Sequence, residues 1–433
     1  MTTTKLKAGT SFFLTLIAIS FWGCKDHVSQ VNPQMANVPI YKSYDDMRSP
    51  VTMGTVNGLK RPGKIYFKDD HIFVSEIGKG IHIIDNSNPS APVNIAFIDI
   101  PGNVDIVIKD NILYADNFTD LVVLDVSDLS NAELITRFEN AFPYALPPYD
   151  ESFPIAEIDP TKGVIIGWKL EAADRVCRDA ECGSQFPVWP SFAFSDTQTQ
   201  SFSSSNSNQS FGRRVSGTGG SMARFALNGD YMYAVNSQDL IVFDISIPRA
   251  PVVLNDNIAI GMDIETIFPY KENLFIGSET GMFIYDVSNP ANPNYISQFS
   301  HVRSCDPVVV EGDYAYVTMR SGGGCGGWTN ELNVVDITPL SNPTLVRTVL
   351  MNNPHGLGID SDKLFVCDGD AGLKIYSATN PYSISLLETK SNINAFDVIA
   401  IDNVLMMIGA DGLYQYDYSN INSLALLSVI PVN

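Results

Sequence analysis

The feature that most constrains this chain is a strand-and-turn pattern that occurs seven times. Each copy is an alternating apolar strand that ends in Asp or Ser and enters a polar turn, as in Gly281-MFIYDVSNPANP. The strand-ending residues are Asp85, Asp125, Asp244, Asp286, Asp336, Ser377 and Asp417. Most neighbours in this series lie about 40 residues apart. A fixed period of that length indicates one structural unit that packs against copies of itself.

Each unit contains four short strands. Two strands flank a polar turn before the shared motif, as in Val104-DIVIKDNILYAD, and a fourth strand follows it, as in Asn294-YISQFS. Four short strands separated by Gly, Asn, Asp and Pro turns are typical of one β-propeller blade. We therefore predict an all-β fold, a seven-bladed β-propeller of four-stranded antiparallel blades over residues 61–433.

The interval between Asp125 and Asp244 is about three times the usual period. It holds the segment 141–220, which is either a long loop insertion or an eighth blade. We favour the insertion, because one strand-like run, Gly163-VIIGWKL, is followed by a Ser/Asn tract that is typical of a flexible segment. The aromatic side chains of the insertion, Tyr149 and Trp168 among them, either stack on a sugar or peptide or pack the insertion onto the propeller.

The repeated segments resemble those of the LVIVD-repeat family, whose name describes the apolar strand that runs into Asp. Gly281-MFIYDVSNPANP is similar to the family motif, whereas Ser377 and the stretch 418–422 depart from it. The resemblance covers about 300 residues. The resemblance implies a bacterial surface lipoprotein with a β-propeller fold and no general activity assigned. It therefore indicates the fold and the location of the protein more than its chemistry.

The recurring carboxylate at the strand end invites a catalytic interpretation. In six of the seven copies the strand ends in Asp, and Ser, Asn or Pro follows two or three residues later. An aspartate in that position accepts hydrogen bonds from nearby backbone N–H groups and caps its own turn, and Ser377 can do the same more weakly. We therefore predict a capping role in preference to a catalytic one.

The N-terminal residues are typical of an export signal. Two lysines precede an apolar run from Ser11 to Trp22, which ends in Gly23-Cys24. A small residue directly before cysteine resembles the lipobox of bacterial lipoproteins. This resemblance implies a signal peptide over 1–23, acylation of Cys24, and a lipid tether with a lead-in segment over 24–60. We expect an outer-membrane lipoprotein exposed on the cell surface, with a plain secretory signal or an uncleaved anchor as the alternative.

Charge and motifs exclude several classes of function. The chain has 27 basic and 48 acidic residues and a net charge of −21, which argues against the concentrated positive patch that nucleic acid requires. The sequence contains no HExxH, GxSxG or P-loop motif. We therefore expect no nucleic-acid partner, no metal and no cofactor, and we assign no catalytic residue.

Five cysteines remain beyond Cys24. In an oxidising compartment, disulfides are the natural interpretation. We predict one disulfide between Cys305 and Cys325, which fall in loops on the same face of one blade, and another between Cys177 and Cys182 within the insertion. Cys367 lies in mid-strand, and we expect it to be a buried thiol without a partner.

An alignment of the first strands of the seven units places one titratable residue of each unit at a common position or, for Glu265, Asp306 and His355, one residue before it. These residues are Lys64, Asp105, Arg224, Glu265, Asp306, His355 and Asp397. The first strand of a blade lines the central channel, so the seven side chains should meet at one channel mouth. Such a ring can orient a polar ligand, hold a cation or supply an acid–base pair, or its charges can simply pair with one another.

Together these features favour a binding or scaffold module for a protein or glycan partner. The module would attach to the membrane through Cys24 and use the channel-mouth face, where the loops of the blades gather. The alternative is a hydrolase or lyase that uses the channel-mouth carboxylates and His355. A purely structural component of the cell envelope is a third possibility.

Overall fold

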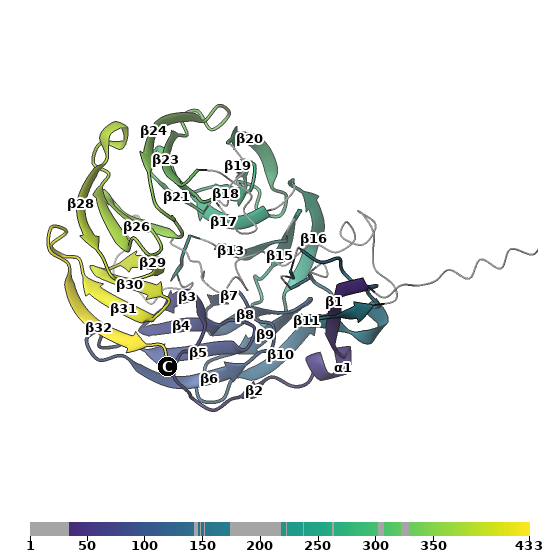
Figure 1. Ribbon diagram of the computed structural model, residues 1–433. Coiled ribbons are helices and arrows are strands. Elements are labelled where there is room, and N and C mark those ends of the chain that lie inside the picture. Colours follow the sequence, from purple (N-terminus) through teal and green to yellow (C-terminus); the bar gives the residue numbers. More distant parts are fainter. Residues whose placement is uncertain are drawn as a thin grey trace, which may run out of the picture.

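The computed structural model describes residues 34–433, with the exception of 143–145, 148, 151, 174–217, 222, 237, 262–263, 302–306 and 322–328. Its strands form seven blades of four antiparallel strands around a common axis (Figure 1). The predicted seven-bladed β-propeller is therefore confirmed. Within the described ranges, no helix is both long and apolar enough to cross a membrane.

Each blade is numbered from the axis outward. Blade 1 contains β3 (Pro62–Lys68), β4 (His71–Glu76), β5 (Gly80–Asp85) and β6 (Val93–Asp99); blade 2 contains β7 (Ile106–Lys109), β8 (Ile112–Asn117), β9 (Asp120–Asp125) and β10 (Glu133–Phe138). Blade 3 contains β13 (Phe225–Asn228), β14 (Tyr231–Val235), β15 (Asp239–Asp244) and β16 (Val252–Ala259); blade 4 contains β17 (Ile264–Tyr270), β18 (Asn273–Ser278), β19 (Gly281–Asp286) and β20 (Asn294–Ser300).

The last three blades follow the same order. Blade 5 contains β21 (Val308–Glu311), β22 (Tyr314–Met319), β23 (Glu331–Asp336) and β24 (Thr344–Leu350). Blade 6 contains β25 (Leu357–Asp360), β26 (Lys363–Cys367), β27 (Leu373–Ser377) and β28 (Ser385–Lys390), with the 3-10 turn η4 (Pro381–Ser383) before its last strand. Blade 7 contains β29 (Ala395–Ile401), β30 (Val404–Gly409), β31 (Gly412–Asp417) and β32 (Ala425–Pro431).

The antiparallel order divides the loops between two faces of the disc. We call the face that holds the second-to-third loops and the blade-to-blade connections the mouth face. The opposite face, which holds the first-to-second hairpins and the third-to-fourth turns, is called the base face. Because every blade repeats this order, equivalent residues of the seven blades lie on the same face.

The strand-ending residues cap the turns of the base face. Each aspartate accepts a hydrogen bond from the backbone N–H two residues later, as Asp286 does from Ser288 at 2.7 Å. The other five acidic copies and Ser377 make the same contact. Hydrogen bonds from that following residue hold the pKa of Asp286 below its ordinary value. The predicted capping role is confirmed.

The blades are apolar on both sides, because each one packs between two neighbours. In β9, four consecutive residues from Leu121 to Leu124 are fully buried. Tyrosines of the second strands connect one blade to the next: the Tyr114 hydroxyl donates to the Pro248 carbonyl at 2.7 Å, and the Tyr233 hydroxyl donates to that of Pro290 at 2.8 Å. A buried tyrosine needs such a partner for its hydroxyl group.

Blade 7 closes the ring against blade 1. Leu59, which precedes β3, forms a parallel bridge with Val432 after β32, and Asn433 N–H donates to the Leu59 carbonyl at 2.8 Å. Side chains add to this closure, since Gln415 Nε2 donates to Asn86 Oδ1 at 2.6 Å. The two ends of the propeller segment therefore hold each other in place.

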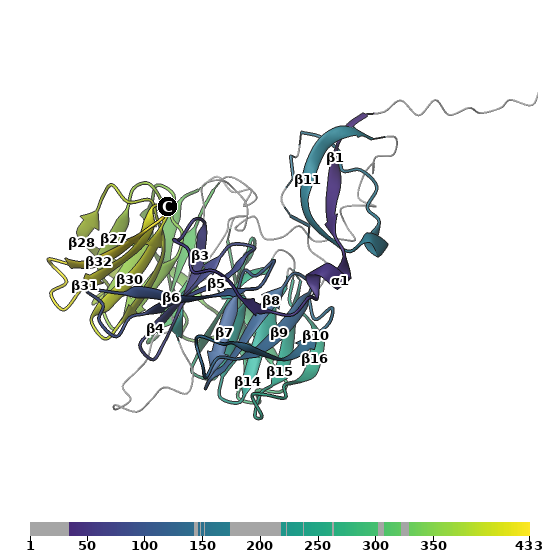
Figure 2. The ribbon, with the colours of Figure 1, turned by 90° about the horizontal axis from the view of Figure 1, so that it is seen from below.

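The lead-in and the insertion combine into a small ribbon beside the disc. β1 (Gln34–Lys42) pairs antiparallel with β11 (Val164–Ala173), which contains the run that the sequence marked as strand-like. Figure 2 shows this ribbon standing off the propeller. The short helix α1 (Tyr44–Met47) and β2 (Thr52–Met53) lead from the ribbon to the outer edge of β6, and η1 (Pro160–Lys162) precedes β11.

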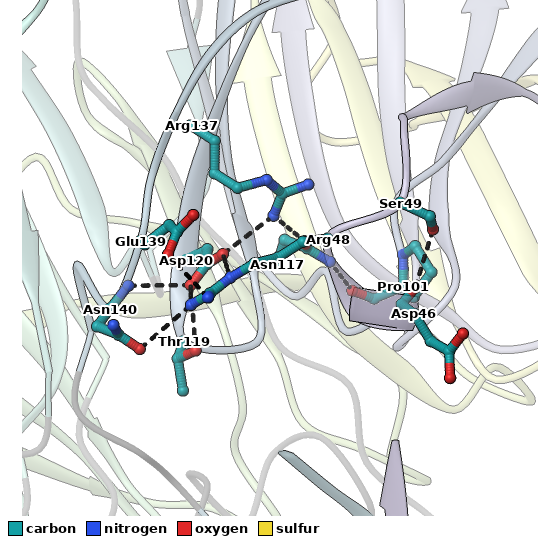
Figure 3. Close-up of polar contacts among 10 residues, drawn as sticks. All are labelled: Asp46, Arg48, Ser49, Pro101, Asn117, Thr119, Asp120, Arg137, Glu139 and Asn140. Atoms are coloured by element: carbon teal, nitrogen blue, oxygen red, sulfur yellow. Dashed lines mark hydrogen bonds and ion pairs between the residues drawn. The ribbon is translucent and has the colours of Figure 1, made fainter. Parts of the chain in front are cut away.

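A cluster around Asp120 fastens the lead-in to blade 2 (Figure 3). The buried Asp120 carboxylate accepts hydrogen bonds from Arg48 Nε at 2.9 Å, from Arg137 Nη1 at 3.2 Å and from Asn140 N–H at 2.9 Å. Burial alone would raise the pKa of Asp120, but the bonds from Arg48 and Asn140 outweigh it and lower the pKa. The ribbon thus leaves the disc at the mouth side of blade 2.

Candidate binding site at the channel mouth

Six of the seven ring residues are described, and all six belong to inner strands or the loops that enter them. Lys64, Asp105, Glu265, His355 and Asp397 are each at most 7% exposed, and Arg224 is half-buried. The ring is therefore a buried polar layer below the mouth rather than an open rim. Asp306 lies outside the described residues, as do Cys24, Cys177, Cys182, Cys305 and Cys325, so lipidation and both disulfides stay predictions.

On the side of blades 1 to 3, the ring charges pair with one another. Lys64 Nζ lies 2.8 Å from Asp105 Oδ2, and the same oxygen accepts the backbone N–H of Arg224 at 2.6 Å. Burial lowers the pKa of Lys64, and the negative charge of Asp105 opposes that effect. In this half of the ring, the charged side chains therefore pair with one another, which is one of the arrangements that the sequence allowed.

Asp116, at the mouth end of β8, completes this network and was not predicted. Its carboxylate accepts hydrogen bonds from Val104 N–H at 2.7 Å and Asp105 N–H at 2.9 Å, and Arg224 Nη1 lies 3.8 Å away. Burial raises the pKa of Asp116 to about 6, and the charge of Arg224 opposes the shift. The carboxylate therefore fixes the loop that enters β7.

Two other blades use the same arrangement. Glu76, which ends β4, accepts the backbone N–H groups of Lys60 and Arg61 at 3.1 and 2.7 Å. Asp368, just after β26, accepts those of Asn352 and Asn353 at 2.9 and 2.8 Å. An acidic residue at the end of the second strand was the signal available in the sequence. The role of this acidic residue could not be inferred from the sequence, because it depends on the blade-to-blade loop that passes over the carboxylate.

On the side of blades 5 to 7, His355 lies in a different environment. Its backbone is held on both sides, because His355 N–H donates to the Cys367 carbonyl at 2.7 Å and its carbonyl accepts the Thr318 hydroxyl at 2.7 Å. The ring packs edge-on against Phe396, with centroids 5.3 Å apart. Neither ring nitrogen has a hydrogen-bond partner among the described residues.

The charge state of His355 follows from its surroundings. Burial lowers the pKa of His355 well below the ordinary value of 6.5, and the positive charge of Arg320 lowers it further. The imidazole is therefore neutral at physiological pH, with one N–H donor and one nitrogen acceptor.

Arg320 is a buried charged residue on this side, and sequence reasoning missed it. It follows β22 at the mouth end of the second strand, and it is 4% exposed. Burial lowers the pKa of Arg320 to about 10, while the charge of Glu265 opposes the shift. Arg320 directly follows the second strand of blade 5, as Asp368 follows that of blade 6, so the mouth ends of the second strands carry charges of both signs.

Cys367 lies beside this group. It is fully buried and forms no disulfide within the described part of the chain, as predicted. Burial raises the pKa of its thiol well above the ordinary value, and the carboxylates of Asp397 and Asp368 add to the shift. Cys367 is therefore a neutral packing residue rather than a nucleophile.

The end of the insertion enters the channel, which the sequence did not indicate. β12 (Thr218–Gly219) pairs with Phe67 and Tyr66 of β3, on the side of that strand that faces the axis. Ser221 is almost fully buried, and its Oγ accepts the backbone N–H of Leu357 in β25 at 3.0 Å. The segment thus lies inside the channel and contacts both blade 1 and blade 6.

Two aromatic residues of the insertion pack within the ribbon. Trp168 Nε1 donates to the Pro147 carbonyl at 2.8 Å, and its ring meets that of Tyr149 edge-on at 5.8 Å. Of the two uses predicted for these side chains, the structure shows the packing role for this pair.

A comparison with known families now decides what kind of repeat this is. The model of the LVIVD repeat matches residues 64–97, 102–140, 219–255, 272–300 and 303–351. This chain therefore contains LVIVD repeats. The matched segments lie in blades 1 to 5 of the LVIVD-repeat protein, and blades 6 and 7, which include the departure at Ser377, repeat the same four-strand geometry. No curated protein matches the sequence at a significant level.

Several solved structures resemble the LVIVD-repeat protein at low identity. The computationally designed Ika8 protein is 10% identical, with coverage of 87% of this chain and 88% of its own and a TM-score of 0.48. BamB from Moraxella catarrhalis is 9% identical, with coverage of 89% and 94% and a TM-score of 0.48. PorZ from Porphyromonas gingivalis is 11% identical, with coverage of 87% and 39% and a TM-score of 0.45. These likenesses are too distant to carry function.

Proposed function

We propose that the LVIVD-repeat protein is a binding or scaffold module of the cell envelope, which holds a protein or glycan partner at its mouth face. In this proposal, Cys24 is the lipid attachment site and the outer membrane is the location, as the lipobox-like Gly23-Cys24 implies. The propeller supplies a rigid disc whose seven inner strands bring polar groups to one place.

The observation that carries this proposal is the state of His355. A buried imidazole with no described hydrogen bond at either nitrogen is costly, since an unsatisfied buried polar group loses about 1–3 kcal/mol. A group outside the described residues can supply the missing donor and acceptor. A partner group that enters from the mouth as far as this buried layer would meet that requirement.

The chemistry of the site narrows the kind of group. A neutral imidazole offers one donor and one acceptor, and a peptide amide or a sugar hydroxyl can satisfy both. Arg320 supplies a positive charge near His355, so an oxygen acceptor on the partner gains further attraction. Protein and glycan partners both present these groups.

The described geometry favours binding over hydrolysis or lyase chemistry. The Asp105 carboxylate is engaged by Lys64 and by the Arg224 backbone, so it is held in a structural role. The charge that acts on His355 is that of Arg320, whereas general-base histidines are usually oriented by a carboxylate.

The proposal is tested by capture of partners from intact cells that express the full chain, with a reversible crosslinker and quantitative mass spectrometry. The variant His355→Phe removes both ring nitrogens and keeps an aromatic ring against Phe396. We expect the captured partner to fall at least fivefold, because the mouth loses its donor and acceptor.

The matched control is Glu272→Ala, an exposed side chain in the base hairpin of blade 4. It should change capture by less than twofold. If His355→Phe captures the same proteins and glycans in the same amounts as the wild type, the mouth around His355 is not the binding site.

A further inference from the structure

The base face of the propeller carries a strong negative charge. In every blade, the first-to-second hairpin contributes at least one acidic residue: Asp69, Asp70, Asp110, Asp230, Glu272, Asp313, Asp362 and Asp402. The strand-ending aspartates add six more on the same face. Charges of one sign gathered on one face attract a partner of the opposite sign over a distance of about 10 Å at moderate salt.

Between blades 1 and 2 this face is hollowed by a groove of about 620 Å³, which we call the base groove. Its floor is apolar and includes Phe67 at the end of β3, Ile108 in β7 and Leu129 in the turn after β9. Its rim is acidic and includes Asp70 and Asp110 of the two hairpins. Asp402, from the hairpin of blade 7, also lines it.

The base groove is lined by four carboxylates, Asp69, Asp70, Asp110 and Asp402, and by one lysine, Lys68, so its net charge is negative. Lys68 is buried in its wall, and its Nζ lies 2.9 Å from Asp69 Oδ2, so these two charges offset each other. Asp70, Asp110 and Asp402 are exposed at the rim. The carboxylates thus surround an apolar surface that is open to solvent.

Lysine and arginine side chains match this combination. Each has an apolar stem that gains from contact with an apolar surface, and a cationic head that gains from nearby carboxylates. We propose that the base groove binds a lysine- or arginine-bearing segment of a protein partner, with the stem of a basic side chain on the floor and its head at the acidic rim. This site lies on the face opposite to His355 and goes beyond the proposed function of the mouth.

The rim can be neutralised without a change of backbone. Asp110 and Asp402 adopt the left-handed region, with φ of 52° and 51°. Asparagine tolerates this conformation as well as aspartate does. The triple variant Asp70→Asn, Asp110→Asn and Asp402→Asn therefore removes three charges and keeps the hairpins. The matched control is Glu272→Gln, Asp313→Asn and Asp362→Asn, which removes three charges from the same face in blades 4, 5 and 6.

The probe is a capped tetralysine peptide titrated into the full-length protein, with Kd measured by calorimetry in 50 mM salt. We expect the groove triple variant to weaken binding at least tenfold and the control triple variant to weaken it less than threefold. The peptide with all four lysines acetylated keeps the stems without the charges, and it should bind at least tenfold more weakly than tetralysine.

Each of the other outcomes overturns the proposal. If the two triple variants weaken tetralysine binding equally, the peptide is attracted by the overall negative charge of the face and does not bind in the base groove. Undiminished binding of the acetylated peptide would show that charge is not recognised, and tighter binding of spermine than of tetralysine would assign the site to a small polyamine. The mouth variant His355→Phe should leave tetralysine binding within twofold of the wild type. The base-groove proposal and the proposed function of the mouth can therefore be refuted independently.

Discussion

Ring residues at equivalent positions acquire different properties from their neighbours. Asp105 and His355 both lie where an inner strand begins, and both are buried. The Asp105 carboxylate is held by direct bonds from the Lys64 ammonium and the Arg224 backbone N–H. His355 meets Arg320 and an aromatic ring, so its neutral form is favoured. Position in the repeat determines where a side chain lies, and the neighbouring residues determine which contacts it makes.

The depressed pKa of His355 predicts a pH dependence of stability. In the folded chain this pKa lies well below 6.5, so below that pH the unfolded chain takes up the proton first and stability falls. This contribution is fully present above pH 6.5 and decreases by up to about 1.4 kcal/mol per pH unit below it. We expect the wild type to lose more unfolding free energy than His355→Phe between pH 7.5 and 5.5.

Denaturant unfolding of both proteins at the two pH values measures this difference. Other titrating groups are common to the two proteins, so they cancel in the comparison. Equal losses in the wild type and in His355→Phe would mean that His355 titrates normally in the folded state.

The residue-scale features divide into those that the sequence predicts and those that it does not. The caps at Asp286 and its equivalents were predictable, because donor and acceptor are two residues apart. Burial of Cys367 was also predictable, because it stands in mid-strand. Asp116 and Arg320 were not singled out, because their roles come from loops and neighbouring blades that a strand alignment does not bring together.

At the scale of elements, the second strands join each blade to the next. Tyr114 in β8 and Tyr233 in β14 are both fully buried, and each donates its hydroxyl hydrogen to a proline carbonyl in the base turn of the following blade. These bonds fix the angle between neighbouring sheets in addition to the apolar contacts.

Removal of one such hydroxyl should weaken the contact between blades. We expect Tyr114→Phe to lower the free energy of unfolding by about 1 kcal/mol, since the Pro248 carbonyl loses its partner. Tyr233→Phe should cost a similar amount, and the two effects should add because the sites are separate.

The control for both is Tyr231→Phe, because no hydrogen bond of the Tyr231 hydroxyl is described. This change should stay within about 0.5 kcal/mol of the wild type in denaturant unfolding. A Tyr114→Phe variant as stable as the control would show that these hydroxyls do not hold the blades together.

The elements of the lead-in and the insertion were less accessible to prediction. The apolar run of β11 was recognisable in the sequence, but its partner β1 lies more than 120 residues earlier. No local feature of either strand indicates that the two strands pair. β12 has two residues, too few for a periodic pattern, and the entry of Ser221 into the channel depends on its contact with Leu357 in blade 6.

At the scale of the whole molecule, closure of the ring gathers the equivalent loops of the seven blades on two faces with different properties. Contacts such as that of Leu59 with Val432 make the disc continuous, so the inner strands converge on one mouth. The mouth presents a buried polar layer, and the base presents acidic hairpins around an apolar groove. One rigid disc with two such faces can hold two partners at once, which is the property expected of a scaffold.

The central claim is that the mouth face contacts a partner in the cell, and site-specific photocrosslinking tests it most directly. A photoreactive amino acid is placed at Asn352, an exposed mouth residue between blades 5 and 6, and separately at Leu387 on the outer edge of blade 6. We predict a discrete crosslinked product from position 352 that is absent from position 387 and is lost in His355→Phe. Equal crosslinking from both positions, or none from position 352, would contradict the account.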